Sequence, residues 1–287
     1  MKKFFAIFFL AALLYSCVNQ NTSDGRLKVA VSIPPEIFVV NAIAADSVNI
    51  YCVMDKGNNP ESFEPSISQI RELSSADVYF AIGLLDFERG LTDRISESGK
   101  NVTLINFCDS VALLYGTHGE CSHHHHHKTD ADPHIWSSIE NLKKMGSAVC
   151  NTLSRLDSKN EGFYRKSLTD FIIKLDSADS IIKHNIDIAP SKSFIVWHPS
   201  LSYFAHDYGL SQIVVGNHGK EQSIGLLKDR IDEAVAQDCR VFLFQKEFDA
   251  SQATTANEKI GARFVEINSM NENVTDELIH ISNELSK

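Results

Sequence analysis

A histidine-rich segment at 118–131 carries the most distinctive chemistry in the sequence. It contains an unbroken run from His123 to His127. Each imidazole, neutral or protonated, needs a polar partner, so the run cannot lie in an apolar core and is expected to form an exposed loop. Imidazole is a favoured ligand of Zn²⁺, Ni²⁺ and Cu²⁺, and such a run can bind these ions weakly and interchangeably. An affinity tag is the alternative interpretation, but tags usually stand at chain ends, and natural-looking sequence lies on both sides of this run.

The residues around this loop alternate between strand-like and helix-like patterns, in two series. Short β-branched or aromatic runs predict strands, and apolar residues spaced three and four apart predict helices. In the first series we expect strands at 27–33, 48–53, 78–82 and 102–107, and helices at 36–45, 66–76 and 85–98. In the second series we expect strands at 193–197, 212–215, 240–244 and 263–267, and helices at 201–208, 224–237, 251–260 and 272–285. This order is typical of parallel sheets, so the sequence predicts an α/β fold with two lobes, each on a mainly parallel sheet.

A long helix is expected between the two series. Apolar residues keep a spacing of three and four from Tyr164 to Ile182. At 1.5 Å per residue, a helix from about 160 to 185 would be roughly 35–40 Å long, enough to join both lobes. We therefore divide the chain into an N-terminal lobe at 27–156, a linking helix at 157–188 and a C-terminal lobe at 189–287. A rigid helical connection is expected to limit hinge opening.

The first residues have the pattern of an export signal. Lys2 and Lys3 precede an apolar run at 4–14, which is shorter than the roughly 20 residues that a membrane-spanning helix needs. The sequence that ends in Cys17 resembles a bacterial lipobox, in which the cysteine is lipidated, although an ordinary signal peptide before a cysteine is the alternative. We predict a signal peptide at 1–16 and a lipidated tether at 17–26. This tether would hold the domain at a membrane of the cell envelope, facing the periplasm or the exterior.

Composition narrows the classes of protein that this chain can belong to. The 287 residues are 43% hydrophobic and 22% charged, which is ordinary for a globular protein and excludes a disordered or fibrous chain. Its 27 Lys and Arg against 37 Asp and Glu give a net charge of −10 without a basic run, which disfavours a nucleic-acid partner. Besides Cys17, the other cysteines are scattered without CxxC spacing, and no disulfide connectivity follows from them.

Four further segments carry a resemblance to a known family. They are Asp132-Pro133-His134-Ile135-Trp136 and the residues at 57–65, 77–83 and 197–210. In this order, together with the histidine-rich loop and the lipobox, they resemble the zinc- and manganese-type solute-binding proteins of bacterial ABC transporters, often called the ZnuA-like family. The resemblance covers about Leu27 to the C-terminus. It implies a metal site in the cleft between two α/β lobes, with Glu61, His134 and His198 at the positions of its ligands.

The implied ligand set departs from the common pattern of the family in two places. A histidine is frequent at the position of Glu61, and a carboxylate is a competent zinc ligand but a harder one, so Mn²⁺ stays possible beside Zn²⁺. Near the C-terminus the family often has an aspartate where this chain has Asn268, and an amide oxygen is a poor zinc ligand. The fourth ligand is left open between water, Asn268, Gln245 and Glu247.

These features predict the role of the protein. We expect an extracytoplasmic lipoprotein that binds a metal ion, zinc in the first place, and delivers it as a monomer to the permease of an ABC transporter with a cytoplasmic ATPase. The histidine-rich loop would collect ions at low affinity for the cleft. The alternatives are a manganese uptake protein, a periplasmic metal buffer and an adhesin-like lipoprotein on the same scaffold. An enzyme is not expected, because the sequence lacks HExxH, GxSxG, P-loop and dinucleotide-binding motifs.

Overall fold

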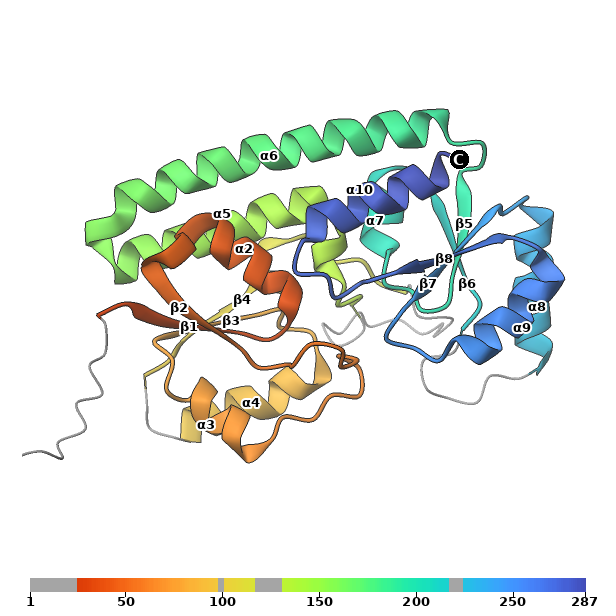
Figure 1. Ribbon diagram of the computed structural model, residues 1–287. Coiled ribbons are helices and arrows are strands. Elements are labelled where there is room, and N and C mark those ends of the chain that lie inside the picture. The colour runs from red at the N-terminus through yellow and green to blue at the C-terminus, as the bar shows by residue number, and fades with distance from the viewer. Residues whose placement is uncertain (1–24, 98–100, 117–130, 217–223) are drawn as a thin grey trace, which may run out of the picture.

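The structure is a computed structural model (Figure 1), and it describes four stretches of the chain: 25–97, 101–116, 131–216 and 224–287. The predicted signal peptide at 1–16, the predicted lipidation site Cys17 and all but the last residue of the histidine-rich loop lie outside these stretches. Within them, no helix combines the length and the apolar character needed to cross a bilayer.

Each lobe is built on a four-stranded parallel sheet (Figure 1). The strand order is β2-β1-β3-β4 in the N-terminal lobe and β6-β5-β7-β8 in the C-terminal lobe, and every pairing is parallel. The strands are β1 (Leu27–Val31), β2 (Val48–Cys52), β3 (Val78–Ala81), β4 (Thr103–Asn106), β5 (Ser193–Val196), β6 (Ser211–Val214), β7 (Val241–Gln245) and β8 (Arg263–Ile267). Every residue of β3 and β7 is buried, as central strands covered on both faces require. The prediction of two α/β lobes on parallel sheets is confirmed.

Helices cover both faces of each sheet. In the N-terminal lobe, α2 and α5 lie on one side of the sheet and α3 and α4 on the other (Figure 1). The α-helices are α2 (Pro34–Ala44), α3 (Ile67–Leu73), α4 (Asp86–Glu97), α5 (Ile139–Leu156), α6 (Glu161–Ile188), α7 (Ser202–Asp207), α8 (Ile224–Ala236), α9 (Ala250–Ile260) and α10 (Val274–Leu285). Short 3₁₀ turns are η1 (Ala45–Ser47), η2 (Phe107–Ser110), η4 (Ile135–Ser137) and η5 (Ser158–Asn160).

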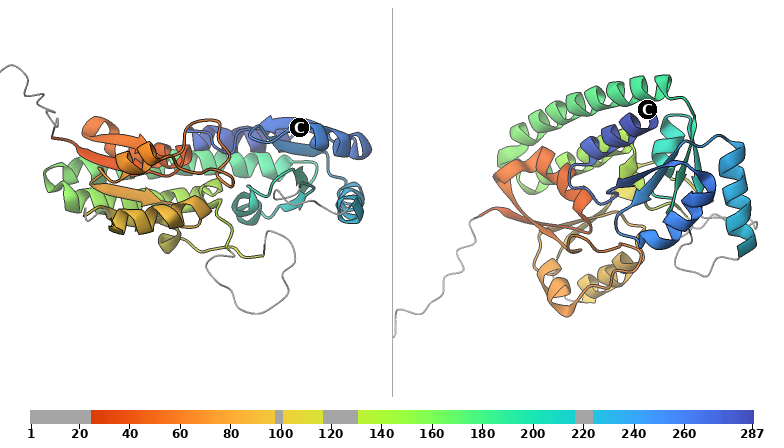
Figure 2. Two further views of the ribbon diagram at one scale, coloured as in Figure 1. Left: turned by 90° about the horizontal axis from the view of Figure 1, so that it is seen from below. Right: turned by 45° about the vertical axis from the view of Figure 1, so that its right-hand side comes forward.

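The long helix α6 joins the lobes. Its 28 residues correspond to about 42 Å, and it packs against α2 and α5 of the N-terminal lobe and against α10 of the C-terminal lobe (Figures 1 and 2). Its buried side chains belong to one hydrophobic core that includes residues of both lobes, such as Phe80 and Leu278. The prediction of a long connecting helix is confirmed. It begins at Glu161 rather than at residue 157, because η5 turns the chain first.

Two buried acids order the loops at the carboxyl ends of β1 and β3. Glu36 Oε2 accepts hydrogen bonds from the backbone N–H groups of Ser32 and Ile33 at 2.7 and 2.9 Å. Glu88 accepts the N–H groups that follow β3, among them that of Gly83 at 2.7 Å, and the hydroxyl of Ser32 also donates to it. Burial raises the pKa of both carboxyl groups. These bonds stabilise the same edge of the sheet from which the loop that carries Glu61 leaves β2.

Candidate metal centre

Three loops bring the predicted ligands together between the lobes. Glu61 lies in the loop that follows β2, and His134 directly precedes η4 in the N-terminal lobe. His198 follows β5 in the C-terminal lobe, two residues after the strand ends. Glu61 and His198 therefore leave the carboxyl ends of two parallel sheets, the edge at which open α/β sheets bind ligands.

The three side chains are in contact. The Nε2 atoms of His134 and His198 are 3.2 Å apart, with ring centroids at 5.0 Å. His198 Nε2 is also 3.4 Å from Glu61 Oε1. Both histidines are buried, whereas the Glu61 side chain is 31% exposed. Burial raises the pKa of the Glu61 carboxyl, and the nearby charge of His134 opposes part of that rise.

These distances match the spacing of metal ligands. Two ligands at roughly 2.0–2.1 Å from one tetrahedral zinc ion stand about 3.3 Å from each other. As they stand, however, no three His, Cys, Asp or Glu side chains of the described part of the chain are grouped so as to hold an ion. The two imidazoles instead share a hydrogen bond. A rearrangement of these side chains is therefore required before an ion can be surrounded.

Asp132 orients His134. Its Oδ1 atom accepts hydrogen bonds from the backbone N–H of His134 at 2.9 Å and from the ring Nδ1–H at 2.8 Å. Burial of Asp132 opposes its ionisation, but the charge and hydrogen bonds of His134 outweigh this and hold the pKa of Asp132 far below its usual range. Because Nδ1 donates, a neutral His134 keeps the lone pair of Nε2 directed at His198. A carboxylate–imidazole pair of this kind fixes the tautomer that a metal ion needs.

We expect Asp132→Asn to weaken zinc binding by about 10–100-fold, the usual cost of losing a group that orients a histidine ligand. The amide keeps an oxygen acceptor for His134 but loses the negative charge that supports the Nδ1–H tautomer. Competition against a chromophoric chelator measures the change. Asp187→Asn, at an exposed position on α6, is the matched control. Equal zinc affinity in both variants would contradict the orienting role.

Gln245 positions the other histidine. The side chain is fully buried, its Oε1 accepts the backbone N–H of His198 at 3.2 Å, and its Nε2 donates to the carbonyl of His198 and to Ser200 Oγ. Both polar atoms of Gln245 are thus used to hold the segment that carries His198. Among the four candidates for a fourth ligand, Gln245 is the one that this geometry assigns to a supporting role.

Two aromatic side chains pack against the histidines, and no role was predicted for either of them from the sequence. Phe248 stacks on His198 with ring centroids at 5.1 Å, and Trp136 lies 5.1 Å from His134. The position of Trp136, two residues after His134 in one motif, could have suggested its role, whereas no local pattern marks Phe248. Three of the histidines left outside the site are exposed, and they are His184, His206 and His280. His218 lies outside the described residues.

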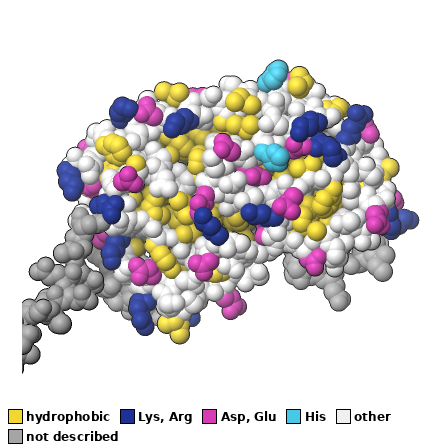
Figure 3. All heavy atoms as spheres, in the orientation of Figure 1, with side chains coloured by type: hydrophobic (Ala, Val, Ile, Leu, Met, Phe, Trp, Pro, Cys, Tyr) yellow, Lys and Arg dark blue, Asp and Glu magenta, His cyan; other side chains and the backbone are white. Residues whose placement is uncertain are grey.

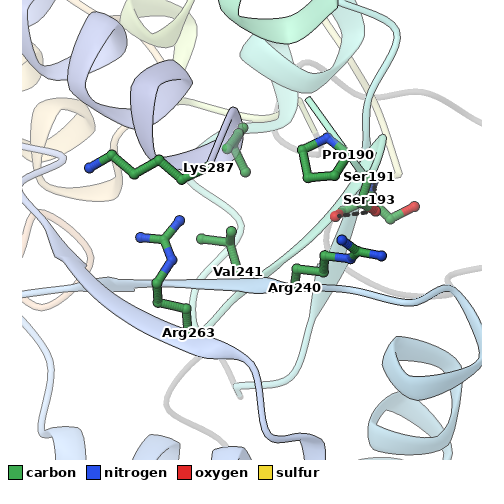
Figure 4. Close-up of a pocket in the computed structure, with 8 residues that line it drawn as sticks. Pro190, Ser191, Ser193, Arg240, Val241, Arg263 and Lys287 are labelled. Carbon is green, nitrogen blue, oxygen red and sulfur yellow. Dashed lines mark hydrogen bonds between the residues drawn. The ribbon is translucent and has the colours of Figure 1, made fainter. Parts of the chain in front are cut away.

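A pocket at the opposite end of the C-terminal sheet has different chemistry (Figure 4). It lies at the amino ends of β5, β7 and β8 and is lined by Pro190, Ser191, Ser193, Arg240, Val241, Arg263, Leu285 and Lys287. Arg263 and Lys287 both pair with Glu284, and Arg240 pairs with Asp238. A pocket lined with cationic groups does not suit a divalent cation. On the face drawn in Figure 3, Lys and Arg are interleaved with Asp and Glu rather than gathered into one field.

The chain is similar in sequence and in structure to known metal-binding proteins. The sequence model of the family described as ZnuA, zinc-uptake complex component A, periplasmic, matches residues 29–283. A crystal structure of ZnuA superposes with a TM-score of 0.82 and 27% identity, over 91% of this chain and 98% of that one.

Two curated relatives are named for different ions. The zinc-binding lipoprotein AdcA of Streptococcus pneumoniae is 26% identical over 279 residues, which cover 93% of this chain and 54% of AdcA. The manganese ABC transporter substrate-binding lipoprotein PsaA of Streptococcus mitis is 25% identical over 223 residues, which cover 76% of this chain and 72% of PsaA. The chain therefore spans about half the length of AdcA.

Proposed function

The chain belongs to the family of ZnuA, the periplasmic component A of zinc-uptake complexes, and on this basis we propose that it is an extracytoplasmic binding protein that captures zinc and delivers it to the permease of an ABC transporter. The observation that carries the proposal is that His198 of one lobe lies 3.2 Å from His134 and 3.4 Å from Glu61 of the other lobe. The ion is the cargo of the protein, and no catalytic role is proposed.

The donor set favours zinc over manganese. Two imidazole nitrogens suit Zn²⁺, whereas Mn²⁺ prefers oxygen donors and binds most mixed sites more weakly. Glu61 supplies one oxygen, so Mn²⁺ is the second candidate. The relatives include proteins for both ions, since AdcA is named for zinc and PsaA for manganese.

Capture and release would depend on the two lobes. His134 and Glu61 come from one lobe and His198 from the other, so a small separation of the lobes would pull the ligands apart and release the ion. Other contacts also cross between the lobes. Lys56 pairs with Glu272 at 3.0 Å, and Trp136 Nε1–H donates to the carbonyl of Ser269 at 3.0 Å.

The place of the protein in the cell follows from the N-terminal pattern and from its relatives. We assign Cys17 as the lipid attachment site after removal of residues 1–16, and AdcA and PsaA are both named as lipoproteins. A membrane permease and its cytoplasmic ATPase are the proposed partners, because PsaA is named as the substrate-binding protein of an ABC transporter.

Metal content tests the proposal. We expect the mature chain, with and without residues 118–131, to bind one tightly held zinc ion, with a Kd below about 1 μM, corresponding to roughly 8 kcal/mol. The measurement is elemental analysis after dialysis, followed by competition titrations with Zn²⁺ and Mn²⁺. Tighter manganese than zinc would move the assignment to manganese uptake. Absence of any stoichiometric ion once residues 118–131 are deleted would overturn the proposed cleft site.

A further inference from the structure

A second carboxylate lies on a segment in contact with the histidines. Glu247 follows β7 by two residues, in the loop between β7 and α9. Its neighbour in sequence, Phe248, stacks on the ring of His198 with the two rings tilted by 25°. The backbone that carries Glu247 is therefore held against one of the proposed ligands.

The side chain of Glu247 is also tied to the segment of the other histidine. The hydroxyl of Ser269 donates to Glu247 Oε1. The carbonyl of Ser269 accepts the indole N–H of Trp136, whose ring packs on His134. Burial raises the pKa of Glu247, while the Ser269 hydroxyl, the backbone N–H of Glu247 itself and the charge of His134 oppose that rise.

One oxygen of this carboxylate has no hydrogen bond. Glu247 Oε2 is buried and is without a hydrogen-bond partner in the part of the chain that the structure describes, whereas Oε1 is held by Ser269. A buried carboxylate oxygen without a hydrogen-bond donor is costly unless it is protonated or a cation compensates it. The fixed Oε1 leaves Oε2 as the atom that can bind such a cation.

We propose that Glu247 is the fourth ligand of the transported ion, through Oε2, beside His134, His198 and Glu61. The inference rests on the proposed function and completes its site. Two carboxylates balance the charge of a divalent ion, so the ion and its four ligands are formally neutral, with Asp132 adding one negative charge behind His134. A neutral site of two nitrogens and two oxygens can be buried between the lobes at a lower desolvation cost than a charged one.

Asn268 is the competing candidate. Its Oδ1 atom is also buried without a partner among the described residues, and its backbone N–H donates to Glu277 at 2.8 Å. Asn268 contributes to a small, mainly apolar pocket that Trp136 and Leu278 also line. Carboxylate oxygens rather than amide oxygens are the usual oxygen ligands of zinc, which favours Glu247 as the ligand.

Titration of the mature chain with one equivalent of Zn²⁺ or Co²⁺ tests the inference. We expect Glu247→Gln to weaken zinc binding by about tenfold or more, because the neutral amide keeps an oxygen but loses the charge, and to alter the visible absorption bands of the Co²⁺ form. Glu258→Gln, exposed on α9, should change neither. The melting temperature of metal-free Glu247→Gln should equal or exceed that of the parent, since a buried carboxylate without a full set of partners is removed.

The possible outcomes separate this inference from the proposed function. If the parent chain binds no stoichiometric zinc, the proposed function fails and the ligand assignment fails with it. If the parent binds zinc and Glu247→Gln has the same affinity and Co²⁺ spectrum, only the assignment of Glu247 is overturned. A loss of affinity in Asn268→Ala instead would give the fourth position to Asn268, and no loss in either variant would give it to water. A destabilised Glu247→Gln with an unchanged Co²⁺ spectrum would reduce Glu247 to a structural role.

Discussion

His198→Ala is expected to weaken zinc binding by about 10²–10³-fold, the largest loss of affinity of any single substitution in the site. His198 is in contact with two of the other proposed ligands, since its Nε2 lies 3.2 Å from His134 Nε2 and 3.4 Å from Glu61 Oε1. Zinc sites with four protein ligands are worth roughly 10–16 kcal/mol, or about 3–4 kcal/mol for each ligand. Removal of one ligand therefore corresponds to an increase in Kd of about 10²–10³-fold.

A matched variant separates this effect from a general one. His206→Ala removes an exposed imidazole on α7, eight positions along the chain from His198, and should leave zinc affinity unchanged. Both variants are compared with the parent by isothermal titration in competition with a chelator, after circular dichroism has established that they are folded. Parent-like affinity in His198→Ala would show that the tightly bound ion sits elsewhere, with the histidine-rich segment at 118–131 as the first place to search.

Most of the fold could be predicted from local patterns. Central parallel strands are buried on both faces, so they are continuous apolar runs such as the one in β3, and the helices between them show three-and-four spacing. The helix α5 was missed although its pattern is present. Ile139, Leu142, Met145, Val149 and Leu153 all lie on its buried face.

The burial of two acidic residues in the N-terminal lobe could not be predicted from local sequence patterns. Glu36 and Glu88 are fully or almost fully buried, although charged residues at helix starts are usually exposed. Their burial depends on hydrogen bonds from backbone N–H groups of the loops that close over them. Because every residue except proline has such a group, the sequence does not show where these bonds form.

The candidate site likewise contains residues that could be predicted from local motifs and residues that could not. His134, His198 and Glu61 could be named because they stand in motifs, and Asp132 stands in the same motif as His134. Roles for Gln245, Phe248 and Ser269 depend on how loops of the C-terminal lobe meet the N-terminal lobe, which no short sequence pattern encodes. Contacts of this kind, formed between segments far apart in the chain, decide how a ligand is oriented even when its identity is evident.

Gly83→Ala is expected to lower the free energy of unfolding by about 3 kcal/mol. Gly83 follows β3 with a φ of +82°, a conformation that costs an L-residue roughly 1–2 kcal/mol. An added Cβ would also lie 2.7 Å from Asn106 Cβ and from Cys108 Sγ, and overpacking of this kind adds about 1–3 kcal/mol. Because the N–H of Gly83 donates to the buried Glu88, a shift of this backbone would also weaken the bonds that order the loop after β3.

Gly57→Ala isolates the conformational part of this cost. Gly57 has a similar φ of +87°, but nothing lies within 4 Å of an added Cβ, so only the backbone penalty of about 1–2 kcal/mol is expected. Urea unfolding of the two variants and the parent measures the difference. The amount by which Gly83→Ala lowers the free energy of unfolding beyond Gly57→Ala measures the cost of overpacking between the turn after β3 and the segment at Asn106 and Cys108. Equal decreases in the free energy of unfolding would contradict this prediction. They would mean that the loop ordered by Glu88 can accept a side chain at residue 83 without overpacking.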